Sequence, residues 1–163
     1  MVGRHFSEEL LLDMALANGL AYPDLAPQPR EKLSYVLEAI RLVQHELSGR
    51  VPLIGFVGAP FTLASYAIEG GHSNTFAKTK SLMYGHPAEW HRLCERLSQM
   101  AGTYLVAQIE AGVDAVQVFD SWVGALSPAD YEEFVAPWSG RILAALREAG
   151  VPSIHFGTGT ATI

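Results

Sequence analysis

Apolar residues recur along this chain at intervals of three and four, which is the pattern of helices with one buried face. The pattern runs from Arg30 to Ser48, and Gly49 stands where a C-terminal cap belongs. A longer stretch from Pro87 to Gly112 shows the same period, and its first proline suits the opening turn of a helix. We therefore predict one long helix in each range.

Further helices are predicted where capping and turn residues enclose an apolar stretch. Ser127, Pro128 and Asp130 combine an N-cap hydroxyl, an N1 proline and a capping-box acid. A helix is predicted to begin there, and Pro137 predicts a kink within it. The remaining predicted helices cover Ser7 to Gly19, Phe61 to Glu69, Ser73 to about Tyr84, and Ser127 to Ala149.

Three short runs of β-forming residues lie between the helices, at 52–57 (PLIGFV), 114–119 (DAVQVF) and 152–156 (PSIHF). The first run is apolar apart from Gly55, which is typical of a strand buried on both faces. Strands that alternate with helices through short junctions indicate βαβ units in a parallel sheet. Three strands leave two sheet edges uncovered, and a closed barrel of this kind needs about 250 residues. The predicted fold class is therefore α/β, an incomplete (β/α)8 TIM-type barrel of about three parallel strands with their helices.

Charge and composition then narrow the classes of partner. Eleven Lys and Arg against seventeen Asp and Glu give a net charge of -6, and no basic run exists to follow a phosphate backbone or an anionic membrane. The apolar stretch 10–17 is too short to span a bilayer, and the acidic Glu8 and Glu9 before it do not suit a signal peptide. The single cysteine, Cys94, predicts no internal disulfide and no zinc cluster. We expect a cytoplasmic protein that binds neither nucleic acid nor membrane.

Catalytic residues of (β/α)8 barrels lie at the carboxyl ends of strands, and this rule selects three places in the chain. They are Gly58 to Thr62 with Tyr66, Asp120 to Trp122, and His155 with the Gly-Thr-Gly-Thr loop at 157–160.

Each place also has an interpretation in which its residues serve the fold and bind no ligand. Gly58 and Pro60 are ordinary turn residues, and Tyr66 alone fits a half-buried core aromatic. Asp120, placed after a buried strand, must either face a cleft or find partners, and both interpretations stay open. A neighbouring residue is expected to satisfy the polar groups of His155.

Two further patterns suggest ligands but lack supporting residues. The Gly-Thr-Gly-Thr loop offers backbone N–H groups to a phosphate, yet its glycines do not have the Rossmann spacing. His91 and Cys94 stand three residues apart on the long predicted helix, but no third metal ligand accompanies them.

Two long motifs resemble the uroporphyrinogen decarboxylase family. Residues 55–71 (GFVGAPFTLASYAIEGG) resemble the signature of these enzymes, and residues 111–122 (AGVDAVQVFDSW) resemble a second block of the family. The resemblance extends from about Glu31 to Ile163. We therefore divide the chain into an unmatched N-terminal segment, 1–26, and a partial barrel domain, 27–163.

The resemblance implies a (β/α)8 barrel, a homodimer in its full-length form, that acts as a carboxy-lyase in haem biosynthesis. Such enzymes convert the four acetate groups of the tetrapyrrole uroporphyrinogen III to the methyl groups of coproporphyrinogen III, with no metal or organic cofactor. Tyr66 and Ser121 match substrate-contacting positions of the two motifs, so they are the expected substrate-binding residues.

The resemblance places the catalytic residues elsewhere. The family's catalytic aspartate, its carboxylate-binding arginines and its C-terminal histidine have no counterpart here, so we expect no catalytic residue in this chain. We also expect no turnover from the 163 residues alone. Asp120 belongs to a different motif from the catalytic aspartate, and orienting its neighbours is one role that it could have.

Other functions stay open. One alternative is a catalytically incompetent product of a truncated gene. Another is a corrinoid-dependent methyltransferase of the same superfamily. The methyltransferases hold zinc through a His-x-Cys arrangement and a later cysteine, a pattern that Cys94 does not supply. A phosphate-binding barrel that uses residues 157–160 leaves both long motifs unexplained.

Overall fold

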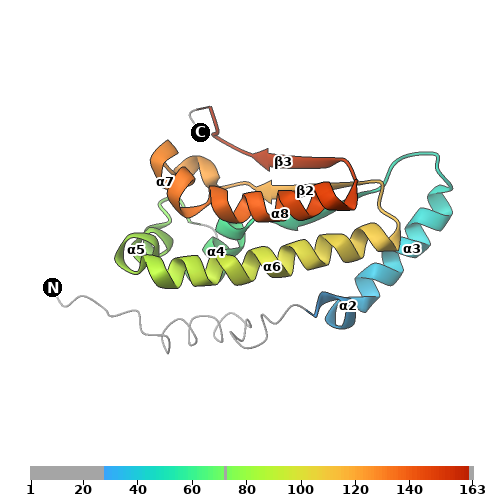
Figure 1. Ribbon diagram of the computed structural model, residues 1–163, viewed down its shortest axis with the longest axis horizontal. Helices are drawn as coiled ribbons and strands as arrows, with labels where there is room; N and C mark the ends of the chain where they lie inside the picture. The colour runs from blue at the N-terminus through green and yellow to red at the C-terminus, as the bar shows by residue number, and fades with distance from the viewer. Residues whose placement is uncertain (1–27, 72, 162–163) are drawn as a thin grey trace.

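The computed structural model describes residues 28–71 and 73–161, and its strands form one parallel sheet (Figure 1). Strands β1 (Ile54–Gly58), β2 (Ala115–Asp120) and β3 (Ser153–Gly157) lie in the order β1-β2-β3, with both pairs parallel. The three predicted strands and their parallel arrangement are confirmed. The helix predicted between Ser7 and Gly19 lies outside the described residues.

The helix predicted from Pro87 to Gly112 is confirmed as α6 (Pro87–Ala111), which runs along the sheet (Figure 1). Pro87 stands in its first turn, and Gly112 ends it in the left-handed region at φ 112°. Glycine reaches this region without the clash that a side chain would cause. No helix in the described ranges is long and apolar enough to cross a membrane.

Two of the predicted helices are divided in the structure. The predicted helix from Arg30 to Ser48 forms α2 (Pro29–Lys32) and α3 (Ser34–Leu47), which are separated by Leu33. Each part has its own contact with α6: the Arg30 guanidinium is paired with Glu110, and Leu37 of α3 packs on α6 in a small apolar cluster. Tertiary contacts, which the periodicity does not show, thus fix two separate segments.

The helix predicted from Ser127 is likewise divided, into α7 (Pro128–Phe134) and α8 (Ala136–Ala149). Its capping box is confirmed, because the Ser127 hydroxyl accepts from the Asp130 N–H and the Asp130 carboxylate accepts from the Ser127 N–H. The predicted kink is a full break at Val135 (φ −123°, ψ −50°), two residues before Pro137. A proline lacks the N–H that would continue the helical hydrogen bonds, so the first helix ends before it.

The remaining helices lie between β1 and α6 and after β2. They are α4 (Pro60–Glu69), α5 (Ala77–Gly85) and the 3-10 turn η2 (Val123–Ala125). Ser73 was predicted to cap α5, but its hydroxyl accepts from the Phe76 N–H, and α5 begins only after Phe76 at φ 52°. Ser73 therefore closes a turn that precedes the helix.

The two faces of the sheet have different surroundings. Val116 and Val118 of β2 are fully buried in one apolar cluster with residues of α6 and α8. On the other face the register places Phe56, Gln117 and Ile154 in one row, with Phe56 62% and Ile154 44% exposed. The prediction that the first strand is buried on both faces is thus wrong for the described residues. An apolar inner face is what a closed barrel requires, so the arrangement is that of a partial TIM-type barrel.

Polar groups at β1 and α6 are satisfied by specific side chains. The Gln108 amide accepts from the Phe56 N–H and donates to the Phe56 carbonyl, both at 3.0 Å. A Cβ atom on Gly55 would lie 2.7 Å from the Gln108 side-chain oxygen, which explains the glycine in an otherwise apolar strand. Trp90, fully buried in α6, donates its indole N–H to the Phe134 carbonyl at 2.9 Å and so joins α6 to the end of α7.

Candidate functional site

The carboxyl ends of the three strands meet at one edge of the sheet, and α4, α5 and α7 gather around that edge (Figure 1). The Ala59 N–H, just after β1, donates to the Phe119 carbonyl of β2 at 2.7 Å. The three places selected from the sequence are therefore brought to the same edge, as a parallel sheet requires.

Tyr66 lies in α4 and is 53% exposed, so it is not the core aromatic of the structural interpretation. Its ring packs against Trp122, with ring centroids 4.2 Å apart and the planes tilted by 40°. Trp122 also contacts Phe76, with centroids 5.3 Å apart. The Tyr66 ring is thus supported by the residue that follows Ser121.

Ser121 follows β2 directly and is half-buried. Its carbonyl accepts a hydrogen bond from the Thr158 hydroxyl of the loop after β3. The two loops are in close contact, because a Cβ atom on Gly124 would overlap the Thr158 carbonyl oxygen. The Gly-Thr-Gly-Thr loop thus packs against the β2 loop and holds the Ser121 backbone in place.

Asp120 is fully buried and has partners on three other elements. Its carboxylate accepts from the Thr62 hydroxyl of α4 at 3.3 Å and from the Ser139 hydroxyl of α8 at 3.4 Å. The His155 Nε2 atom of β3 lies 3.6 Å from the same carboxylate. The structure therefore supports the interpretation in which Asp120 finds partners, and it places Asp120 as the polar neighbour of His155.

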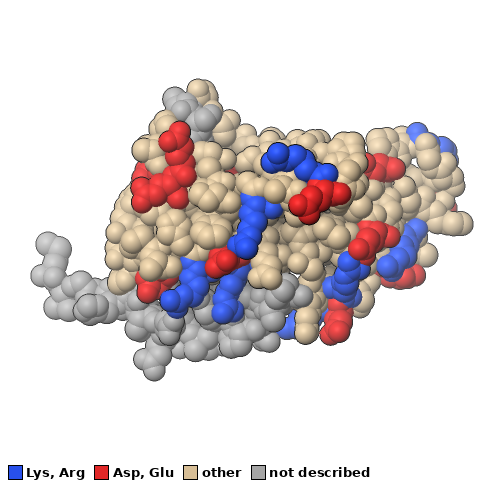
Figure 2. Space-filling view, viewed as in Figure 1, with Lys and Arg blue, Asp and Glu red and all other residues tan. Residues whose placement is uncertain are grey.

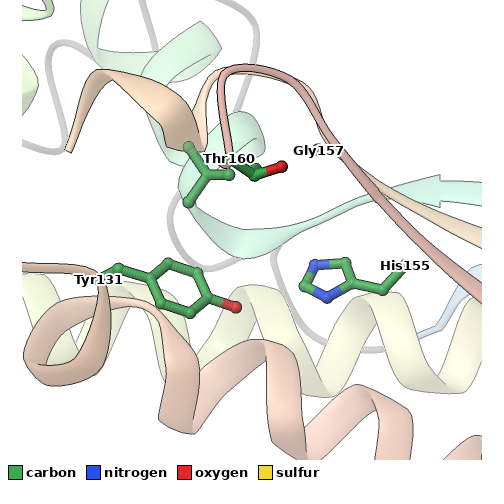
Figure 3. A pocket seen from close by; sticks show the side chains of 5 residues that line it. Tyr131, His155, Gly157 and Thr160 are labelled. Carbon is green, nitrogen blue, oxygen red and sulfur yellow. The ribbon is translucent and has the colours of Figure 1, made fainter. Parts of the chain in front are cut away.

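His155 also lines a cavity of about 190 Å³, together with Val123, Tyr131, Gly157 and Thr160 (Figure 3). Figure 3 shows the Tyr131 hydroxyl and the His155 imidazole pointing toward each other across it. Burial, and after it the negative charge of Asp120, raises the pKa of the Tyr131 phenol. The Tyr131 hydroxyl therefore stays protonated near neutral pH and can donate a hydrogen bond into the cavity.

An aromatic row crosses the face of the sheet that carries Phe56 and Ile154, which the described residues leave uncovered. The Phe119 ring contacts Phe56 and Phe156 edge to face, with centroids 5.7 and 5.5 Å apart. Because Phe119 lies two residues before Ser121, this apolar row leads up to the edge where Tyr66 and Ser121 lie.

His91 and Cys94 take structural roles. The His91 Nδ1 atom accepts from the Trp138 indole N–H at 3.2 Å, and its ring stacks on Phe134. Burial raises the pKa of the Cys94 thiol well above its ordinary value, with a smaller contribution from Asp120. Within residues 28–71 and 73–161, no group of three or more His, Cys, Asp or Glu side chains could hold a metal ion.

The sequence did not indicate several contacts at this edge, nor that Ser139 reaches it. Thr62 and Ser139, the hydroxyl partners of Asp120, lie 58 and 19 residues from it in the chain. Trp122 belongs to the second selected place, but its contact with the Tyr66 ring was not indicated. Strand and helix periods indicate which face a residue occupies but not which distant side chain it meets, so no local signal could have identified these pairs.

Comparison with known proteins gives one family. The family model described as "Uroporphyrinogen decarboxylase (URO-D)" matches residues 5–163. Proteins named uroporphyrinogen decarboxylase are similar to this chain: one from Thermus thermophilus is 60% identical over 132 residues, and one from Salinispora tropica is 58% identical over 136 residues.

The match covers most of this chain but a minor part of each relative. It includes 81% of this chain and 38% of the Thermus protein, and 83% of this chain and 36% of the Salinispora protein. A protein of the same name from a Roseiflexus species, 54% identical over 138 residues, gives 82% and 40%. The chain thus spans about two fifths of the length of these relatives.

Proposed function

This chain belongs to the uroporphyrinogen decarboxylase family, and from that we propose that it forms the central part of an enzyme that decarboxylates uroporphyrinogen III to coproporphyrinogen III. The observation that carries the proposal is the family match over residues 5–163. Relatives with that name at 52–60% identity support it. On the same resemblance we propose that the complete protein is a cytoplasmic homodimer.

We assign Tyr66 and Ser121 to the binding of substrate carboxylates. Two features support this role: both residues lie at the carboxyl edge of the sheet, and the Tyr66 ring is exposed beside Trp122. A hydroxyl that donates to a carboxylate contributes about 1.5–3 kcal/mol, because one partner is charged. Two such donors would fix the orientation of a substrate that carries eight carboxylates.

The chemistry places few demands on this part of the protein. A protonated pyrrole carbon is itself the electron sink that accepts the electron pair of the breaking carbon–carbon bond, so carbon dioxide can leave without a cofactor. The protein must supply a proton donor and a fixed negative charge, and it must keep water from the cleft. We assign the last of these tasks to the aromatic row of Phe56, Phe119 and Phe156, and none of the catalytic groups to this chain.

A chimera tests the proposal. The 132-residue matching segment of the 60% identical Thermus thermophilus relative is replaced by the corresponding part of this chain, which gives a complete barrel that contains these residues. Product is measured by chromatography of the oxidised porphyrins after incubation with uroporphyrinogen III. The unmodified relative is the positive control, and the 163-residue chain alone is the third sample.

We expect coproporphyrinogen from the chimera and none from the chain alone. A chimera that has the circular dichroism of the unmodified relative but forms no product would contradict the proposal. That result would favour the alternative of a catalytically incompetent gene product. The methyltransferase alternative has no support in the described part of the chain, where no zinc-ligand cluster occurs.

A further inference from the structure

Asp120 joins four elements of the fold at the edge where Tyr66 and Ser121 lie. Its carboxylate is fully buried at the end of β2 and accepts hydrogen bonds from Thr62 of α4 and Ser139 of α8, beside His155 of β3. Burying a carboxylate costs free energy unless polar partners replace the lost water. These partners come from separate elements, so their contacts with Asp120 fix the elements relative to one another.

The two proposed substrate-binding residues lie close in the chain to Asp120 or to one of its partners. Thr62 precedes Tyr66 by four residues in α4, about one helical turn or 6 Å along the axis. Ser121 is the next residue after Asp120, and the Tyr66 ring packs on the residue after that, Trp122. A change in the Thr62–Asp120 contact therefore moves the helix that carries Tyr66 relative to the strand end that carries Ser121.

We propose that Asp120 is a positioning residue, whose buried carboxylate sets the Tyr66 hydroxyl and the Ser121 hydroxyl at a fixed separation by holding α4 through Thr62. The inference rests on the proposed function, since it concerns how these two residues meet the substrate. It extends that function, because the resemblance gives Asp120 no role in catalysis or binding. Asp120 touches neither substrate nor reacting atoms in this proposal and acts only through its partners.

The test uses three variants of the active chimera. Asp120→Asn replaces one carboxylate oxygen by an amide NH2 group, which cannot accept a hydrogen bond from the partners, so it is the direct variant but also the one most liable to misfold. Thr62→Val keeps the side-chain shape and removes a single donor to Asp120. Thr103→Val is the matched control, because Thr103 lies in α6 and its hydroxyl donates to the Gln99 carbonyl of its own helix.

Steady-state kinetics separate positioning from mere stability. For Thr62→Val we expect KM for uroporphyrinogen III to rise about fivefold with kcat changed less than twofold, while Thr103→Val stays within twofold of the parent in both. We also expect the Thr62→Val effect to vanish when Tyr66 is already phenylalanine, because the displaced hydroxyl is then absent. A purely structural role predicts an unchanged KM for the folded protein, or an effect that persists in the Tyr66→Phe background.

Hydrogen exchange gives a readout that does not depend on turnover. We expect amides of α4 (60–69) to exchange at least threefold faster in Thr62→Val than in Thr103→Val, with the amides of α6 (87–111) equal in both. An active chimera in which Thr62→Val matches Thr103→Val in KM and in exchange overturns the inference. An inactive but folded parent chimera overturns the proposed function instead, so the two failures are distinguishable.

Discussion

Gly124 marks the closest approach between the loops that follow β2 and β3. A Cβ atom there would overlap the Thr158 carbonyl oxygen and lie 2.8 Å from Gly159, and both contacts are with backbone. Backbone cannot rotate away as a flexible side chain can, so a methyl group at this position forces the two loops apart. The position of Ser121, whose carbonyl is held by Thr158, depends on this contact.

Gly124→Ala is therefore expected to destabilise the chimera by about 1–3 kcal/mol, the usual cost of overpacking. The matched control is Gly102→Ala in α6, where an added Cβ meets nothing within 4 Å. That change is expected to stabilise the helix by up to about 1 kcal/mol, because alanine loses less backbone entropy than glycine. Denaturant unfolding measures both. Equal changes in the free energy of unfolding for Gly124→Ala and Gly102→Ala, with the same sign, would show that the loops move to accommodate the added methyl group.

Tyr66→Phe tests the proposed substrate contact at a single oxygen atom. The phenylalanine ring can keep the packing on Trp122, so fold and stability should be unchanged. Loss of one hydroxyl–carboxylate hydrogen bond, about 1.5–3 kcal/mol, lowers kcat/KM for uroporphyrinogen III by at least about tenfold. Kinetics of the chimera equal to those of the parent would exclude Tyr66 from binding. Tyr35→Phe, in exposed α3, is the control and should leave the kinetics unchanged.

Among the elements, α7 depends most clearly on a local signal. Its capping box satisfies N–H groups that the first helical turn leaves without partners. Ser127→Ala removes the hydroxyl that accepts from the Asp130 N–H and is expected to cost about 1 kcal/mol. Hydrogen exchange over α7 (128–134) checks this, with α8 (136–149) as the internal reference. Unchanged exchange over α7 would mean that packing of Phe134 alone maintains the helix.

The same box gives α7 a pH dependence with a defined sign. The Ser127 hydroxyl, and after it the Tyr84 hydroxyl, lower the pKa of the Asp130 carboxyl from its ordinary 3.8, with burial opposing them. A lowered pKa in the folded state stabilises the fold above the ordinary value, and the stabilisation is lost as pH falls through the lowered one. Unfolding experiments at about pH 7 and about pH 3 should therefore show a smaller gap between parent and Asp130→Asn at the lower pH. An equal or larger gap in acid would contradict this linkage.

The elements also show how far local patterns determine the fold. Hydrophobic period, prolines and terminal glycines predicted the three strands, α4 and α6 to within two residues, because each of these signals acts within one or two helical turns. The break at Leu33 was not predicted, and the break at Val135 was predicted only as a kink at Pro137. On either side of Leu33, Arg30 and Leu37 contact α6 at separate points, and no local pattern reveals these contacts.

The candidate site also combines features that local patterns predict with contacts that they do not. Topology alone predicts that the residues after three parallel strands share one edge, and the structure has them there. The pairing of Asp120 with Thr62, and of Tyr66 with Trp122, depends on how α4 rotates over the sheet. That rotation is set by packing of the whole apolar cluster around Phe61 and Trp90, so it could not be read from spacing.

At the scale of the molecule, charges and apolar surface are separately distributed. Figure 2 shows basic and acidic side chains interspersed over much of one face, with an acidic group over α7. The acidic residues of α7 include Glu132 and Glu133, both exposed. The apolar surface lies instead on the uncovered face of the sheet, where Ile54, Phe56 and Ile154 are all more than two fifths exposed. Water contact with this surface is unfavourable in proportion to its area, so the face favours association.

Phe56→Ser is expected to have opposite effects in the chain alone and in the complete barrel. In the isolated chain Phe56 is 62% exposed, so the polar side chain removes apolar surface from water and should lower aggregation, measured by light scattering. In the chimera the same face becomes the packed interior of the barrel, where serine leaves a cavity and an added hydroxyl, and the variant should unfold at lower denaturant. Leu42→Ser is the control, because Leu42 is 61% exposed on α3. A Phe56→Ser chimera as stable as the Leu42→Ser chimera would mean that the aromatic row does not face the interior of a closed barrel.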